Sequence, residues 1–143
     1  MRTLIKDQPY SKTSCYSNVR KGPVLTDALL TDNKDTKQVE ILAFIDSGCD
    51  DTIMRWAKKV ELEAKIGHDL PCEIVQNSIT GKKISAYKVS VVFGGEKFTP
   101  VPGIHCPPDY LFDREDVLIG RDIMRELVIT LNGPNEVFTI ERP

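Results

Sequence analysis

The sequence has no long apolar run, no large excess of one charge and few cysteines. No apolar stretch approaches the roughly 20 residues that span a bilayer, and residues 1–7 lack the apolar segment of a secretory signal. We therefore expect no membrane partner and a cytoplasmic location. The 19 Lys and Arg residues nearly balance the 21 Asp and Glu residues. That balance argues against a nucleic-acid partner, whose phosphates require clustered basic residues.

The four cysteines form no C-x-x-C pair, and a chain of 143 residues does not depend on a disulfide scaffold. We interpret them as reduced thiols. A zinc site could combine His68 and Cys72 with His105 and Cys106. Adjacent residues rarely face one ion, however, and the loop spacings of zinc modules are missing. We predict no metal and no other cofactor.

Short apolar runs separated by turn residues dominate the chain after residue 22. Strands are expected at 24–30, 39–45, 72–76, 83–93, 97–101, 117–119, 128–131 and 137–140, with a short helix at 122–127. Many short strands with at most two helices indicate an all-β fold built as a small closed β-barrel. Residues 1–22 are polar and unpatterned, and we interpret them as an N-terminal extension or flexible arm. Residues 23–143 then form one domain.

A first helix is expected after Asp51 and Thr52, whose side chains offer capping oxygens. This helix would have one apolar face, formed by Ile53, Trp56, Ala57 and Val60. Beyond residue 60 the sequence supports two alternatives. The strict alternation of 60–66 favours a strand, whereas its composition favours a helix that ends at Gly67.

Asp46 follows the apolar strand at 39–45 and precedes Ser47 and Gly48. This order places a carboxylate at the end of a buried strand. The hydroxyl can fix the loop by hydrogen bonds, and the glycine lets another backbone approach closely. Alone, Asp-Ser-Gly is a common tripeptide that mostly marks an ordinary turn. A functional interpretation of Asp46 therefore depends on the residues around this tripeptide.

Two segments resemble the signatures of the retropepsins, the retroviral-type aspartic proteases. Residues 44–54 (FIDSGCDDTIM) resemble their active-site segment, and residues 117–124 (VLIGRDIM) resemble their second signature, apolar-apolar-Gly-Arg-Asp/Asn-apolar-apolar. The segments lie about 70 residues apart, in the family's order. The resemblance covers roughly residues 23–143. It implies a small closed β-barrel of the acid-protease type, functional as a homodimer, that hydrolyses a polypeptide bound as an extended strand.

The resemblance also implies roles for single residues. Asp46 matches the catalytic aspartate, and Ser47 matches the residue whose hydroxyl locks the two active-site loops of the dimer together. Gly48 matches the glycine whose carbonyl receives substrate hydrogen bonds. Asp50 and Asp51 match the acidic pair that contacts the substrate.

Three further positions follow from the same resemblance. Arg121 matches the arginine that pairs with the position of Asp50 and braces the dimer. The hairpin around Thr80 and Gly81 matches the substrate-covering flap, although it has one glycine where retroviral flaps have several. Cys49 stands where the family usually has alanine.

Aspartic peptidases need two carboxyl groups that share one proton. At contact distance the two groups cannot both be ionised, because their negative charges repel each other. The chain has one Asp-Ser-Gly, so the second Asp46 must come from a symmetry mate. We expect the strand at 137–140 to build the interface. The prediction is an aspartic endopeptidase. The alternative is a non-catalytic module of the same fold that binds peptides or only dimerises, and residues 1–22 could influence dimer assembly in either case.

Overall fold

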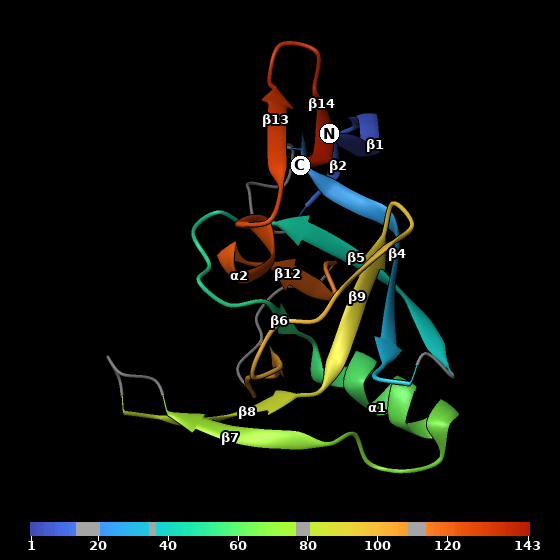
Figure 1. Cartoon of the computed structure of the whole chain (residues 1–143), viewed down its shortest axis with the longest axis vertical. Coiled ribbons are helices and arrows are strands. Elements are labelled where there is room, and N and C mark those ends of the chain that lie inside the picture. Colours follow the sequence, from blue (N-terminus) through green and yellow to red (C-terminus); the bar gives the residue numbers. More distant parts are fainter. Residues whose placement is uncertain (14–20, 35–36, 77–80, 109–113) are drawn as a thin grey trace.

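The computed structural model describes residues 1–13, 21–34, 37–76, 81–108 and 114–143 (Figure 1). These residues are mainly β. In chain order the elements are β1 (Arg2–Pro9), β2 (Ser11–Lys12), β3 (Lys21–Gly22), β4 (Val24–Asp32), β5 (Gln38–Ile45), β6 (Ile53–Met54), α1 (Trp56–Ile66), β7 (Cys72–Gln76), β8 (Lys83–Tyr87), β9 (Val89–Phe93), β10 (Glu96–Phe98), β11 (Ile104–His105), β12 (Val117–Ile119), α2 (Arg121–Met124), β13 (Val128–Asn132) and β14 (Val137–Arg142).

Nine strands form one curled sheet in the order β10-β9-β4-β5-β12-β6-β11-β8-β7. Most neighbours are antiparallel, but β12 runs parallel to β5, and β11 runs parallel to β6. The prediction of a mainly β fold is therefore confirmed. Within the described residues the sheet begins at β10 and ends at β7, so its closure into a barrel stays a prediction.

The short strand β12 lies in the middle of this sheet, between β5 and β6. All three of its side chains, Val117, Leu118 and Ile119, are buried. A strand covered on both faces reads as an uninterrupted apolar run rather than as an alternating one. The burial of apolar area fixes this strand in the middle of the sheet, and the segment that follows starts from there.

A separate three-stranded sheet joins the two ends of the chain in the order β1-β14-β13. β1 pairs antiparallel with β14, and Leu4 joins the same core cluster as Phe138 and Ile140. The interpretation of residues 1–22 as an unpatterned arm is thus wrong for residues 2–9, which form a strand. The sequence does not reveal this strand, because a single buried leucine among polar residues gives no alternating pattern of apolar side chains. The predicted domain boundary after residue 22 remains a prediction.

This sheet also corrects the expected interface strand. β14 contains residues 137–140, and it lies between β1 and β13, with which it pairs on its two sides. Both of its hydrogen-bonding edges are therefore occupied within one chain. The edges that the sheet leaves open belong to β1 and β13.

Replacing Leu4 with Ala should destabilise the protein by about 2–4 kcal/mol, because the loss of a large buried side chain would leave a cavity. Leu4 is 9% exposed, and it packs so closely against the turn at Gly94 that a Cβ added to this glycine would lie 2.6 Å from the Leu4 Cβ. The matched control is Lys6→Ala on the same strand, where the side chain is exposed. Urea unfolding measures both changes, and equal midpoints for the two variants would contradict the packing of β1.

The helical alternative for residues 60–66 is confirmed. α1 spans Trp56–Ile66 and ends at Gly67, whose φ of 82° is left-handed and whose N–H donates to the Glu63 carbonyl. Glycine takes this conformation without a Cβ penalty, which is why it ends helices so often. The predicted cap at residues 51–52 is wrong, since the residue that precedes the helix is Arg55 and it makes no side-chain capping bond.

The predicted apolar face of α1 is also wrong. Trp56 and Val60 are 52% and 45% exposed, while the buried positions are Leu62 and Lys59. The ammonium of Lys59 is tolerated there because it lies 2.8 Å from a carboxylate oxygen of Glu63 and 4.0 Å from the Trp56 ring centroid. A paired cation thus occupies a place where periodicity alone expects an apolar side chain.

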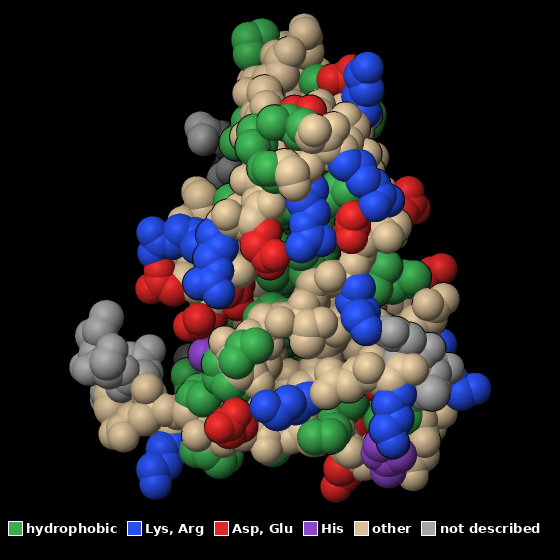
Figure 2. Space-filling view, in the orientation of Figure 1, with side chains coloured by type: hydrophobic (Ala, Val, Ile, Leu, Met, Phe, Trp, Pro, Cys, Tyr) green, Lys and Arg blue, Asp and Glu red, His purple; other side chains and the backbone are tan. Residues whose placement is uncertain are grey.

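The surface carries charges of both signs. On the face that Figure 2 shows, Lys and Arg side chains are interspersed with Asp and Glu side chains and do not gather into one patch. Neither α1 nor α2 has the length and apolar character to traverse a bilayer, and the described residues contain no other helix.

Candidate active site

The two motif segments meet because β5 and β12 are adjacent parallel strands. Ile45 lies opposite Ile119 in the register, and the Asp46 N–H donates to the Ile119 carbonyl at 3.0 Å. Parallel strands end at the same edge of a sheet. Asp46 and Gly120, which follow the two strands, therefore start two loops side by side.

Asp46 opens a tight turn that orients its own carboxylate. The Gly48 N–H donates to Asp46 Oδ1 at 3.0 Å, and the Cys49 N–H donates to the Asp46 carbonyl at 3.2 Å. Asp46 is half-buried, whereas Ser47 and Gly48 are exposed. The result is a carboxylate held at the surface by a backbone donor.

A buried clamp holds this loop to the start of α2. Thr52 Oγ1 donates to Asp122 Oδ1 at 2.7 Å, and the Thr52 N–H donates to Asp122 Oδ2 at 3.0 Å. The same hydroxyl accepts the Gly120 N–H at 3.1 Å. Thr52 is fully buried, so each of these polar groups is satisfied inside the protein.

Sequence reasoning missed this clamp. It places Thr52 at a helix cap and gives Asp122 no role. The available signal was a polar residue directly before an Ile-Met pair in each of the two motifs, and two such residues could form a buried pair. The clamp positions the loop and does not touch a reacting group.

The loop also approaches Gly120 through its backbone. The Arg121 N–H donates to the Cys49 carbonyl at 2.8 Å, and the Asp122 N–H donates to the Asp50 carbonyl at 3.1 Å. Two loop carbonyls thereby accept from the first residues of α2, whose N–H groups have no partner inside so short a helix. Gly120 is buried between them, and its missing side chain makes the contact possible.

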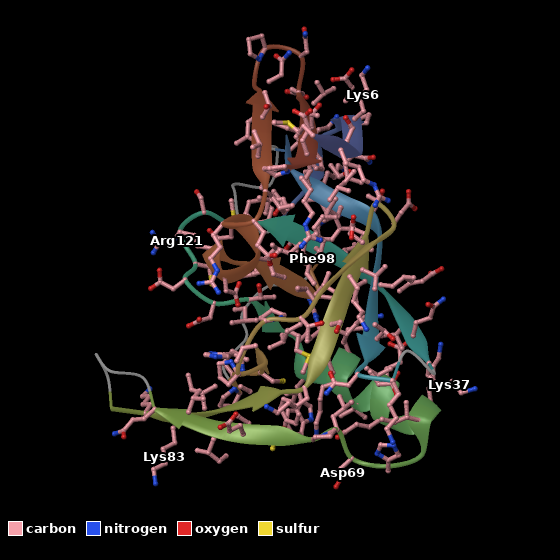
Figure 3. All side chains as sticks on the ribbon, viewed as in Figure 1. Lys6, Lys37, Asp69, Lys83, Phe98 and Arg121 are labelled. Carbon is pink, nitrogen blue, oxygen red and sulfur yellow. The ribbon has the colours of Figure 1, made fainter. Side chains whose placement is uncertain are left out.

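Arg121 and Asp50 form an ion pair within the chain. Their side chains are 61% and 73% exposed, so solvent screens the attraction and the pair contributes under about 1 kcal/mol to stability. Figure 3 labels Arg121 at the outer edge of the molecule, projecting from the α2 side. Its proposed role in bracing a dimer stays a prediction.

The second acidic residue of the loop, Asp51, is exposed and contacts two further groups. Its carbonyl accepts a hydrogen bond from Cys49 Sγ at 2.8 Å, and its Oδ2 lies 4.0 Å from Nδ1 of His105. Burial raises the pKa of the Cys49 thiol above its usual range, and the negative charge of Asp46 raises it further. Cys49 therefore stays a protonated donor at neutral pH. His105 entered the sequence reasoning only as a possible zinc ligand.

The expected flap corresponds to the hairpin of β7 and β8, which extends away from the rest of the molecule (Figure 1). Gly81 has the positive φ, 71°, that is expected of a turn residue, and its carbonyl accepts from Gln76 Nε2 at 3.2 Å. Thr80 lies outside the described residues. β7 is the last strand of the sheet, and its Ile74 is 61% exposed.

No protein-family model matches the chain, and no curated protein matches it either. Among solved structures, it is similar to the crystal structure of a retropepsin-like aspartic protease from Rickettsia conorii, with a TM-score of 0.46 and 18% sequence identity. The alignment covers 85% of this chain and 96% of that one. A likeness of this size does not assign the chain to a family.

Proposed function

We propose that this chain is one half of an aspartic endopeptidase and that Asp46 is its catalytic group. The observation that supports the proposal most directly is the junction of β5 and β12, because it brings the two retropepsin-like segments to one sheet edge, with the Asp46 carboxylate fixed by the Gly48 N–H. The Thr52–Asp122 clamp adds support, since it ties the two segments together at their ends.

The proposed chemistry uses two Asp46 side chains, one from each subunit. One carboxylate takes a proton from a water molecule as that water attacks the scissile carbonyl carbon. The other, protonated, donates a hydrogen bond to the carbonyl oxygen and stabilises the oxyanion that forms. The Gly48 N–H fixes the direction of each carboxylate, so little reorganisation is needed during the reaction. Asp50, Asp51 and the β7–β8 hairpin are the proposed contacts of an extended substrate.

The proposed dimer surface includes the outer edge of β13. Val128 and Leu131 on this strand are 41% and 56% exposed, although most large apolar side chains among the described residues are buried. An open strand edge can pair antiparallel with its own copy across a twofold axis. In Figure 1 the loop that carries Asp46 lies between this C-terminal hairpin and the β7–β8 hairpin, which are at opposite ends of the molecule.

Turnover of a diverse peptide library tests this function. We expect internal peptide bonds to be cleaved in mildly acidic solution, and we expect the rate to fall with the square of the chain concentration below the dimer dissociation constant, because one chain supplies one Asp46. Mass spectrometry of the products and sedimentation of the same samples measure both. A library peptide that is bound but never cleaved would favour the non-catalytic module instead.

A further inference from the structure

The β7–β8 hairpin is attached to the rest of the sheet at its base. β7 is the last strand of the nine-stranded sheet and pairs with β8 along its whole length. β8 pairs with β11 through Ala86 and Tyr87, and its Ser85 carbonyl accepts a backbone N–H from the residue after β11. Residues 75–76 and 81–84 lie beyond these bonds, and the hairpin extends away from the rest of the molecule (Figure 1). Because a two-stranded ribbon is only marginally stable alone, contacts at its base set its orientation.

Two side chains of α1 contact the base of both strands. Lys59 Nζ lies 5.1 Å from the ring centroid of Tyr87, the last residue of β8. The same ammonium lies 2.8 Å from Glu63 Oε1, and Glu63 Oε2 accepts the Leu70 N–H at 2.8 Å. Leu70 is buried two residues before the start of β7. The Lys59–Glu63 pair thus joins α1 both to the end of β8 and to the segment that leads into β7.

Burial makes this pair stronger than the exposed ion pair at the same end of the hairpin. The Lys59 and Glu63 side chains are 11% and 13% exposed, whereas those of Lys88 and Glu73 are 41% and 57% exposed. Solvent screens the exposed pair, but a buried carboxylate that loses its cation is costly. The Trp56 ring, 4.0 Å from the Lys59 ammonium, favours the cation further. Without Lys59, the Glu63 carboxylate would turn toward water and release the Leu70 N–H.

We propose that Lys59 fixes the angle between the β7–β8 hairpin and α1, and that the hairpin pivots about its base when this cation is lost. The pivot lies at Cys72 and Tyr87, which pair at the base of the hairpin. The inference concerns the orientation of the hairpin, and it holds whether or not the chain cleaves peptides. In the proposed enzyme, Lys59 would be a positioning residue that touches no reacting group.

Residual dipolar couplings of the backbone amides measure this angle without any turnover. In wild type, the couplings of residues 72–76 and 83–87 should fit the same alignment tensor as those of α1 and β5. Lys59→Met keeps most of the length of the side chain but removes its charge. In this variant the hairpin couplings should no longer fit that tensor, because the hairpin then samples many angles, while α1 and β5 should still agree with each other.

The matched control is Lys58→Met, the same substitution at the neighbouring position, where the ammonium pairs with Glu61 at 3.0 Å on the same helix. It should retain the common fit. If Lys59→Met does not fold, Lys59→Met combined with Glu63→Met takes its place, since apolar replacement of both partners of a buried pair usually preserves stability. A common fit that survives in the folded variant without Lys59 overturns the proposal. A wild-type hairpin that already departs from the common tensor overturns it as well.

Discussion

Replacing Asp46 with Asn should lower peptide turnover by about three orders of magnitude or more, the range seen when a group that carries the chemistry is removed. The amide has the shape of the carboxylate, and its oxygen can still accept the Gly48 N–H that now binds Asp46 Oδ1 at 3.0 Å. The fold and the dimer should therefore persist. What disappears is the ability to share and transfer a proton. Initial rates on a cleaved peptide, with circular dichroism and sedimentation on the same preparation, measure the separate effects.

Asp27→Asn provides the control for this change, because it makes the same substitution at an exposed position of β4. Its turnover should match that of wild type. An excess of Asp46→Asn chains should also suppress the wild-type rate, since every mixed dimer has a single Asp46. Equal turnover by wild type and Asp46→Asn would refute the catalytic assignment. A wild-type rate that stays unchanged when Asp46→Asn chains are in excess would refute the shared site.

Replacing Gly120 with Ala should have the second largest effect. An added Cβ would lie 2.6 Å from the carbonyl carbon of Asp51, 2.8 Å from its oxygen and 2.9 Å from the Cys49 oxygen. These are backbone atoms, which cannot swing away as the end of a flexible side chain can. The loop must shift, with a stability cost of about 3 kcal/mol at the upper end of overpacking effects. The turnover rate should fall by more than the loss of folded protein explains, because Asp46 belongs to the same loop.

The control is Gly133→Ala in the turn between β13 and β14, where an added Cβ meets nothing within 4 Å. Its free energy of unfolding should stay within about 0.5 kcal/mol of wild type, as for an ordinary surface change. Amide NMR shifts of Gly48 and Cys49 report the loop directly, and they should move in Gly120→Ala only. A Gly120→Ala protein with unchanged loop shifts would show that the backbone contact is looser than these distances imply.

Much of the fold could be predicted from local sequence. β4, β5, β7, β12 and the C-terminal hairpin coincide with runs of branched and aromatic residues bounded by turns, because such residues pack well on a pleated surface. β1 could not be predicted in this way. Its place depends on pairing with β14, which lies at the other end of the chain, and local composition carries little information on contacts of that kind.

The candidate site likewise has one part that the sequence predicted and one part that it could not predict. The family resemblance indicated that the segments around Asp46 and Gly120 belong together, and the parallel pairing of β5 with β12 is the physical link between them. The bonds between Thr52 and Asp122 depend on the mutual position of two loops, which no single segment encodes. The helix face that was assigned wrongly shows a similar limit, since Lys59 is buried only because Glu63 is its partner.

The intrachain sheet of β1, β14 and β13 has a consequence for regulation. Each chain completes the pairing of its C-terminal strand β14 without help from another molecule, so in the proposed dimer folding and assembly would be separate steps rather than a single concerted event. A cell that makes few copies would accumulate folded but inert monomers. The proposed proteolysis would then begin above a threshold of expression, and the abundance of the chain would serve as its own activating signal.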